Sequence, residues 1–172
     1  DLSGIRVHTI GIDRAVNAGF LGRLSAAGGG LFELVESEDR LDEVMANIHR
    51  RIGAPLVRNV ALEPGGLSIV DGTVTPARLP DLFPGVPLVI RGRYTGEGGR
   101  LAVRGTAADG SPWRAEVTGG RHDSPAATAI WARAHVRDLE DAYAVGRRVS
   151  NEDLERQIVA ASLRFGVLCR FT

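Results

Sequence analysis

The sequence predicts a mixed fold in three parts: an α/β segment, an all-β module and C-terminal helices. Two apolar, strand-like runs alternate with two helical patterns up to residue 54. From residue 55 to 120 the helical period is absent, and short apolar runs are separated by turn residues. Helical periodicity returns after residue 120. We therefore expect three domains, at residues 1–54, 55–120 and 121–172.

The α/β segment opens with a predicted strand at Ile5–Ile10. Its β-branched residues occur at both alternating positions, which suits a strand covered on both faces. Gly11–Asp13 are predicted to turn, and Asn17 to cap the following helix. Gly28–Gly30 follow that helix and suit a left-handed exit from it. The apolar face of the predicted helix consists of Phe20, Leu21 and Leu24.

A second strand and helix follow. The strand is predicted at Leu31–Val35, and Ser37 is expected to cap the helix, which Gly53 ends. The order strand, helix, strand, helix is typical of a sheet with crossover connections. One continuous apolar stripe is predicted on the second helix, formed by Leu41, Val44, Met45, Ile48 and Ile52.

The middle part is predicted to form a small antiparallel β-sandwich of five or six strands. Gly98–Gly99 and Asp109–Gly110 lie where hairpin turns are expected. The predicted strands are Val57–Leu62, Leu67–Val70, Pro87–Tyr94, Leu101–Ala107 and Trp113–Val117.

The last part is predicted to contain two helices, which begin at Ser124-Pro125 and at Ser150. A final strand at Val167–Phe171 is expected to join the edge of the sandwich. The residues predicted to point inward are Ile130, Trp131, Ala134, Leu139 and Tyr143 on the first helix, and Leu154, Ile158 and Ala161 on the second.

Composition excludes several classes of protein. The chain has 172 residues, with 21 Lys+Arg against 21 Asp+Glu, so it lacks the positive excess that nucleic acids or anionic membranes require. No apolar run is long enough to span a membrane. Cys169 is the only cysteine, which excludes a disulfide or thiolate zinc site within one chain. All 21 basic residues other than histidine are Arg, and this bias predicts a GC-rich bacterial source.

Asp13 is the candidate ligand-proximal residue, because it follows the end of a strand, where α/β folds place ligands. The alternative is an Asx turn that leads into the helix. A hydrolase or transferase site at Asp13 and His8 is disfavoured, since no nucleophile–base pair accompanies them. His122-Asp123-Ser124 contains the three residue types of a catalytic triad, but adjacent side chains diverge, and a helix cap is favoured.

Several blocks resemble known families in the same order along the chain. The first set of blocks is Val7–Asp13, Val16-Asn17, Phe20-Leu21 and Gly28–Gly30; the second is Leu79–Leu88, Ile130–Arg133, and Ser162–Gly166 with the Phe171-Thr172 ending. The first set resembles the last third of a von Willebrand factor type A domain. The second set resembles inter-α-trypsin inhibitor heavy-chain-like proteins.

The resemblance implies the C-terminal part of a doubly wound A-type domain, followed by an antiparallel β-sandwich and C-terminal helices. Such domains hold a divalent cation (Mg, Ca or Mn), and a carboxylate of the binding partner can complete the cation's coordination shell. The family's Asp-x-Ser-x-Ser motif would precede the region matched here, so no metal ligand is assigned in this chain. Asp71-x-Thr73-x-Thr75 imitates that spacing, but Pro76 follows where the family has a helix.

The function implied by the resemblance is non-enzymatic protein binding of the adhesion type, with this part acting as a scaffold. Its expected partners are a protein of unknown identity and the remainder of the parent A domain. The residues leave the compartment open, and the resemblance favours an extracytoplasmic or cell-surface location. The alternative is a structural assembly module, because two strands leave a sheet edge open for pairing.

Overall fold

The computed structural model describes residues 5–13, 15–52, 55–146 and 150–172. It is mixed in helix and strand, as predicted. Contacts divide the chain into two compact units. Unit 1 comprises Asp1–Glu63, Arg78–Val89 and Ala102–Glu116, and unit 2 comprises Pro64–Ala77, Ile90–Leu101 and Val117–Thr172. The predicted domain boundaries near residues 54 and 120 stay predictions.

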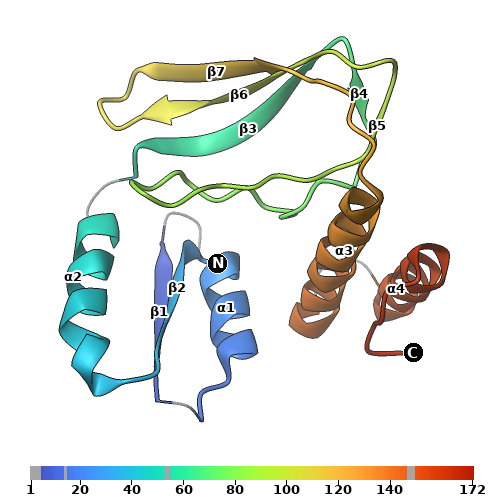
Figure 1. Ribbon diagram of the computed structural model, residues 1–172. Coiled ribbons are helices and arrows are strands. Elements are labelled where there is room, and N and C mark those ends of the chain that lie inside the picture. The colour runs from blue at the N-terminus through green and yellow to red at the C-terminus, as the bar shows by residue number, and fades with distance from the viewer. Residues whose placement is uncertain (1–4, 14, 53–54, 147–149) are drawn as a thin grey trace. The chain divides into compact units, whose positions relative to one another are not determined.

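Unit 1 contains the predicted succession of strand, helix, strand and helix (Figure 1). The elements are β1 (Val7–Ile12), α1 (Ala18–Ala27), β2 (Gly29–Val35) and α2 (Leu41–Ile52), with a short 3-10 helix at Glu38–Arg40 before α2. β1 and β2 pair in parallel, as a crossover through α1 requires. The parallel α/β arrangement expected from the sequence is confirmed for these elements.

The two faces of this sheet contact different helices. On one face, Thr9 Oγ1 donates a hydrogen bond to the Leu21 carbonyl at 2.9 Å, which ties β1 to α1. A Cβ on Gly11 would lie 2.9 Å from Val16 Cγ1, so glycine lets the α1 side approach closely. The other face holds a buried cluster of Val35, Val44 and Ile48, with Ile10 and Leu41 packed against it.

Parts of the predicted apolar faces are open to solvent. Phe20, on the predicted apolar face of α1, is 53% exposed, and Met45, in the predicted stripe of α2, is 44% exposed. Two strands offer too little surface to cover the full apolar width of both helices. The Asn17 cap is confirmed, since its side chain accepts a hydrogen bond from the Phe20 N–H at 2.9 Å. The side chain of Ile52 and residue Gly53 lie outside the part that the structure describes.

The glycines after α1 serve close packing as well as the turn. Gly29 has a φ of +64°, the left-handed conformation predicted for the helix exit. A Cβ on Gly30 would lie 2.1 Å from the Val7 carbonyl oxygen, and one on Gly28 would lie 2.5 Å from Val7 Cβ. The start of β2 can therefore pair with the start of β1 only because side chains are absent here.

The strands of the middle part form two small sheets. β3 (Val57–Gly65), β6 (Arg100–Ala107) and β7 (Pro112–Thr118) make a three-stranded sheet in the order β3-β6-β7. β4 (Ser68–Ile69) and β5 (Tyr94–Thr95) pair antiparallel in a separate sheet. Antiparallel pairing is confirmed in this part of the chain.

The predicted turn at Asp109–Gly110 is confirmed. Gly110 has a φ of +87° and connects β6 to β7. Its N–H donates to the Ala107 carbonyl at 3.0 Å, while Asp109 Oδ1 accepts from the Ser111 N–H at 2.9 Å. The sequence therefore located this connection correctly.

Two predictions in the middle part are wrong in extent. Within Pro87–Tyr94 only Tyr94 belongs to a strand, and Arg91 makes an isolated bridge to Thr75. Proline lacks the N–H that a ladder needs, so Pro87 interrupts regular pairing. Gly98–Gly99 lie between β5 and β6, which belong to different sheets, so they form a loop and no hairpin.

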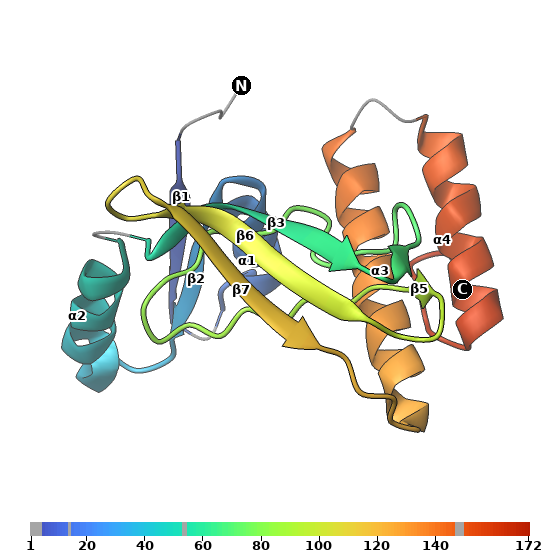
Figure 2. The ribbon, with the colours of Figure 1, turned by 90° about the horizontal axis from the view of Figure 1, so that it is seen from above.

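Two helices dominate unit 2, as predicted. α3 (Pro125–Val145) and α4 (Asn151–Phe165) lie side by side in both ribbon views (Figures 1 and 2). Their buried core consists of Trp131, Ala132, Val136, Ile158 and Val167. The Ser150 cap is confirmed, because its hydroxyl accepts a hydrogen bond from the Asp153 N–H at 3.1 Å.

The predicted final strand at Val167–Phe171 is wrong. Gly166 ends α4 in the left-handed conformation, and the chain then turns back onto the helices. Val167 is 4% exposed and belongs to the helical core, and Phe171 packs edge-on against Tyr143. Both apolar side chains pack against the helices, so their apolar character does not require a strand. Ile130, predicted to point inward, is 46% exposed.

Trp131 joins the helical pair to the loop after β4. Its indole N–H donates to the Thr73 carbonyl at 2.8 Å, and its ring stacks on His135 at 5.1 Å. One turn further along α3 from His135, the Asp138 carboxylate accepts a hydrogen bond from the Ala77 N–H at 2.8 Å. Burial raises the pKa of Asp138 above its ordinary value. Two residues of α3 therefore satisfy backbone groups of the same loop.

The close approach at Gly30 predicts a sharp effect of substitution. Gly30→Ala places a methyl group against the Val7 backbone, so we expect a loss of at least about 2 kcal/mol in the free energy of unfolding. Gly22→Ala is the matched control, because its Cβ would meet nothing closer than 3.9 Å. This control should stabilise the protein by up to about 1 kcal/mol through helix propensity. Urea denaturation followed by circular dichroism measures both, and equal effects would contradict the packing described.

Candidate functional site

A short segment that follows β4 in the sequence is attached to Arg6, the residue before β1. We call Arg78–Phe83 the docking segment. It has no regular secondary structure apart from one bridge between Leu82 and Val57. The Leu82 N–H donates to the Val57 carbonyl at 2.9 Å, and the Leu82 carbonyl accepts from the Leu56 N–H at 2.7 Å. The start of β3 thus sets the position of the docking segment.

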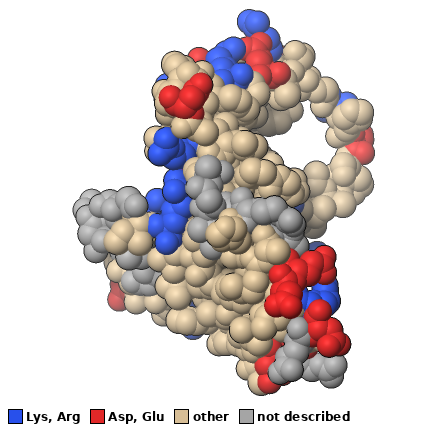
Figure 3. Space-filling view, turned by 90° about the vertical axis from the view of Figure 1, so that its left-hand side faces the viewer, with Lys and Arg blue, Asp and Glu red and all other residues tan. Residues whose placement is uncertain are grey.

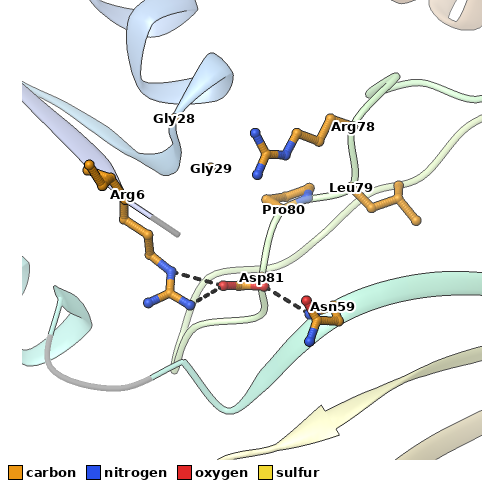
Figure 4. Close-up of a pocket in the computed structure, with 9 residues that line it drawn as sticks. Arg6, Gly28, Gly29, Asn59, Arg78, Leu79, Pro80 and Asp81 are labelled. Carbon is orange, nitrogen blue, oxygen red and sulfur yellow. Dashed lines mark hydrogen bonds and ion pairs between the residues drawn. The ribbon is translucent and has the colours of Figure 1, made fainter. Parts of the chain in front are cut away.

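Asp81 is held from two sides. Arg6, which immediately precedes β1, donates through Nε to Asp81 Oδ2 at 2.9 Å and through Nη2 to the same oxygen (Figure 4). The other carboxylate oxygen accepts from the Asn59 N–H at 3.2 Å. Asn59 has a φ of +55°, a left-handed conformation that asparagine tolerates better than most residues. Asp81 therefore links β1 to β3.

Arg78 makes the second attachment. Its Nη1 donates to the Ala27 carbonyl at 3.0 Å, at the C-terminal end of α1. The last carbonyl groups of a helix lack intrahelical partners and carry partial negative charge, so a cation there is favourable. In Figure 4 the guanidinium of Arg78 points toward Gly28 and Gly29, whereas Leu79 points away.

His8 of β1 and Phe83 of the docking segment make a further contact. Their rings meet edge to face, with centroids 6.1 Å apart, and Phe83 is 3% exposed. His8 Nδ1 accepts a hydrogen bond from the Leu31 N–H at 3.2 Å, which requires a neutral ring. Burial lowers the pKa of His8, and the charge of Arg6 lowers this pKa further. His8 is therefore a partly buried residue that holds β1 to the start of β2 and contacts the docking segment.

The docking segment and the first β/α unit enclose a small polar cleft. Its volume is about 160 Å³, and it is lined by Ile5, Arg6, Gly28, Gly29, Asn59 and Arg78–Asp81. Arg6 and Asp81 neutralise each other, and Arg78 caps a helix. Among the described residues that line the cleft, the polar side chains are Arg6, Asn59, Arg78 and Asp81. The polar groups that line the described part of the cleft thus hold the docking segment against the first β/α unit.

Asp13, the residue predicted near a ligand, lies apart from this cleft. It follows the end of β1 with a φ of +86°, and its N–H donates to the Val35 carbonyl at 2.9 Å. Its side chain is exposed. The structure therefore places Asp13 at the carboxyl end of the strand, as expected, and its role as a ligand-proximal residue stays a prediction.

The other candidate residues serve the backbone or lie at the surface. Thr73 Oγ1 donates to the Val70 carbonyl at 2.6 Å and accepts from the Arg93 N–H at 3.1 Å. His122 is exposed, and Ser124 precedes α3 without a side-chain capping bond. Among the described residues, no three His, Cys, Asp or Glu side chains gather as a metal site would require.

Cys169 is half-buried beside the last turn of the chain. Its Sγ accepts a hydrogen bond from the Phe171 N–H at 3.4 Å. Desolvation raises the pKa of this thiol, but hydrogen bonds from Thr172, Phe171 and Ser162 outweigh it, so the pKa is lowered overall. Cys169 thus packs, partly buried, against the helical core.

Surface charge is mixed. Acidic and basic atoms both occur on the face drawn in Figure 3, and acidic atoms gather at its lower end. Asp42 and Glu43 occupy the first turn of α2, where negative charge complements the helix dipole. Among the described residues, no helix has the length and apolar character needed to cross a membrane.

Comparison with known proteins identifies neither a matching family model nor a matching curated protein. The fold and the docking segment therefore provide the observations from which a function can be proposed.

The sequence missed the residues that form this site. Asp81 lies within the block that resembles a linker, but neither its ion pair with Arg6 nor the helix-capping role of Arg78 was predicted. Arg6 and Asp81 are 75 positions apart, and no local pattern connects residues at that distance. The sequence offered one indication of an attachment here: two charged residues, Arg78 and Asp81, flank the apolar pair Leu79-Pro80 in a segment without strand or helix periodicity.

The ion pair predicts a measurable coupling. Arg6→Ala and Asp81→Ala should each destabilise the protein. A double-mutant cycle should give a coupling free energy of about 0.5–1 kcal/mol, because the pair is only partly exposed and Arg6 donates two N–H groups to Asp81. The matched control is the more exposed pair of Arg114 and Glu63, for which we expect a smaller coupling. Urea titration measures both cycles, and a larger coupling for the control pair would contradict this assignment.

His8 predicts a pH dependence. Its pKa is lowered in the folded state, so the unfolded chain binds the extra proton more readily and stability should fall as the pH drops below about 6.5. His8→Asn places an amide oxygen where Nδ1 accepts its hydrogen bond and removes the titrating ring. We expect thermal melts between pH 5 and 7.5 to show a smaller pH dependence for this variant. The exposed His49→Asn should match the wild type, and identical curves for all three proteins would refute the role of His8.

Proposed function

We propose that this chain is the supporting part of a non-enzymatic, adhesion-type protein that binds other proteins. In this proposal its first β/α units belong to a von Willebrand factor type A domain of the inter-α-trypsin inhibitor heavy-chain-like class. The β-sandwich and C-terminal helices act as the scaffold. A divalent cation and its ligands belong to the preceding part of that domain, and the partner's carboxylate completes the cation's shell.

The observation that supports this proposal most directly is the docking segment. Asp81 and Arg78 attach it to the residue before β1 and to the end of α1, and Leu82 attaches it to β3. These contacts attach the docking segment to the last β/α units of the proposed A domain. A scaffold needs such attachments, whereas an enzyme would need a cleft lined by reactive groups.

The open sides of the sheet also support the proposal. β1 pairs only with β2 among the described residues, so each strand has a lateral edge with no strand beside it. Parallel sheets are otherwise found buried in larger sheets with both faces covered. Ile5 is 58% exposed and Ile12 is 54% exposed, which suits strands with missing neighbours. Further strands of the same domain would cover these groups.

The same open edge favours the alternative of a structural assembly module. There the neighbour of β1 would come from another molecule through backbone pairing, without any cation. A hydrolase with a site near Asp13 is the third candidate and has the least support, since the sequence shows no nucleophile–base pattern with Asp13 and His8. Only the adhesion-type proposal requires that binding of the partner depend on a divalent cation, so this dependence distinguishes it from both alternatives.

A titration tests the proposal. Isothermal titration with Mg²⁺ or Mn²⁺ should show no stoichiometric binding to this chain. The same protein extended at its N-terminus by the residues encoded before Asp1 should bind one cation. Arg6→Ala or Asp81→Ala in the extended protein should weaken cation binding by severalfold, while Glu63→Ala should leave it unchanged. Stoichiometric binding to this chain, or none to the extended protein, would overturn the proposal.

A further inference from the structure

Arg78 is the residue of the polar cleft whose hydrogen-bonding capacity is used least. A guanidinium has five N–H donors, and Nη1 of Arg78 donates to the Ala27 carbonyl at 3.0 Å. Among the described residues, no carboxylate pairs with Arg78, whereas the carboxylate of Asp81 pairs with Arg6. Figure 4 shows the guanidinium of Arg78 apart from that ion pair. The cleft therefore contains a permanent positive charge with unused donors.

The lining of this cleft has an excess of positive charge. Its charged side chains are Arg6, Arg78 and Asp81, which are two cations against one anion. The carbonyl groups at the C-terminal end of α1 offset this excess in part, by the equivalent of about half a charge. One negative charge on a ligand would balance the lining, whereas two would exceed it. The charges of the described lining therefore favour a monoanion.

The size and the remaining lining of the cleft limit the ligand to a small molecule. The volume is about 160 Å³, whereas pockets for drug-sized ligands measure about 300–1,000 Å³. Space remains beside the guanidinium because Gly29 has no side chain, and a Cβ built there would lie 3.7 Å from Arg78 Nη2. Ile5 and Pro80 add an apolar part to the lining. These features suit a carboxylate on a short apolar stem.

We propose that the cleft binds a short-chain monocarboxylate. The two oxygens of the ligand accept hydrogen bonds from unused N–H groups of Arg78, and its stem contacts Pro80 and Ile5. A guanidinium presents its N–H groups as a planar fork that matches a carboxylate, so the pair is specific as well as charged. The bound ligand joins the docking segment to the turn between α1 and β2. The inference is independent of the proposed function, because it uses neither the sheet edge nor a cation.

Titration of the full chain with sodium propionate at constant ionic strength, followed by NMR, tests the site. The amide signals of Gly28 and Gly29 and the Nε–H signal of Arg78 should shift and saturate, with a dissociation constant in the millimolar range. Arg78→Gln should weaken binding at least about tenfold. Arg78→Lys keeps a cation at the end of α1 without the fork, and should weaken binding severalfold. The matched control is Arg104→Gln, because Arg104 is exposed in unit 1 and outside the cleft. Circular dichroism verifies that each variant folds.

Further measurements test the charge and the class of ligand. Asp81→Asn removes the negative charge of the described lining and should tighten propionate binding severalfold, a gain that a damaged fold would not produce. Neutral propionamide should not compete, and phosphate at about pH 8, where it is mostly doubly charged, should bind more weakly than propionate. Signals that do not saturate up to about 100 mM propionate overturn the proposal. So do unchanged affinity in Arg78→Gln, no gain in Asp81→Asn, and phosphate binding tighter than propionate.

Discussion

The attachment of the docking segment to the first strand is the contact on which unit 1 depends. Asp81 accepts hydrogen bonds from Arg6 and from the Asn59 backbone, so one carboxylate fixes the approach of two strands that belong to different sheets. An ionised carboxylate with good hydrogen-bond geometry on both oxygens is well satisfied, and removing it would leave Arg6 and the Asn59 N–H without that partner. Phe83, fully covered beneath it, adds the apolar part of the same contact.

The need for such a contact follows from the narrowness of the sheet. Two parallel strands bury little surface, and an isolated pair of strands has marginal stability in water. α1 and α2 each cover one face, yet several of their apolar side chains have no strand to pack on. The proposal of a supporting role in a larger domain resolves this mismatch without assigning chemistry to residues whose hydrogen bonds are already used within the chain.

Local sequence patterns predicted the helices and several caps and turns, whereas contacts between residues far apart in the sequence could not be predicted from them. Asn17, Ser150 and Gly110 were identified because a cap or a tight turn depends on a few neighbouring residues. The exposure of Phe20 and Met45 could not be predicted, since helical periodicity shows that a face is apolar but not whether a neighbouring element covers it. The Arg6–Asp81 pair could not be predicted, because it depends on how the folded chain brings two remote segments together.

The placement of the two tryptophans gives each unit its own optical reporter. Trp113 belongs to β7 within the part of the chain assigned to unit 1, and Trp131 lies in the core of unit 2. Burial lowers the pKa of His135, so the imidazole stacked on Trp131 stays uncharged near neutral pH. Protonated imidazole quenches indole emission, whereas the neutral ring does so far less. Acidification should therefore dim one fluorophore selectively, which would let a single spectrum distinguish the two halves of the molecule.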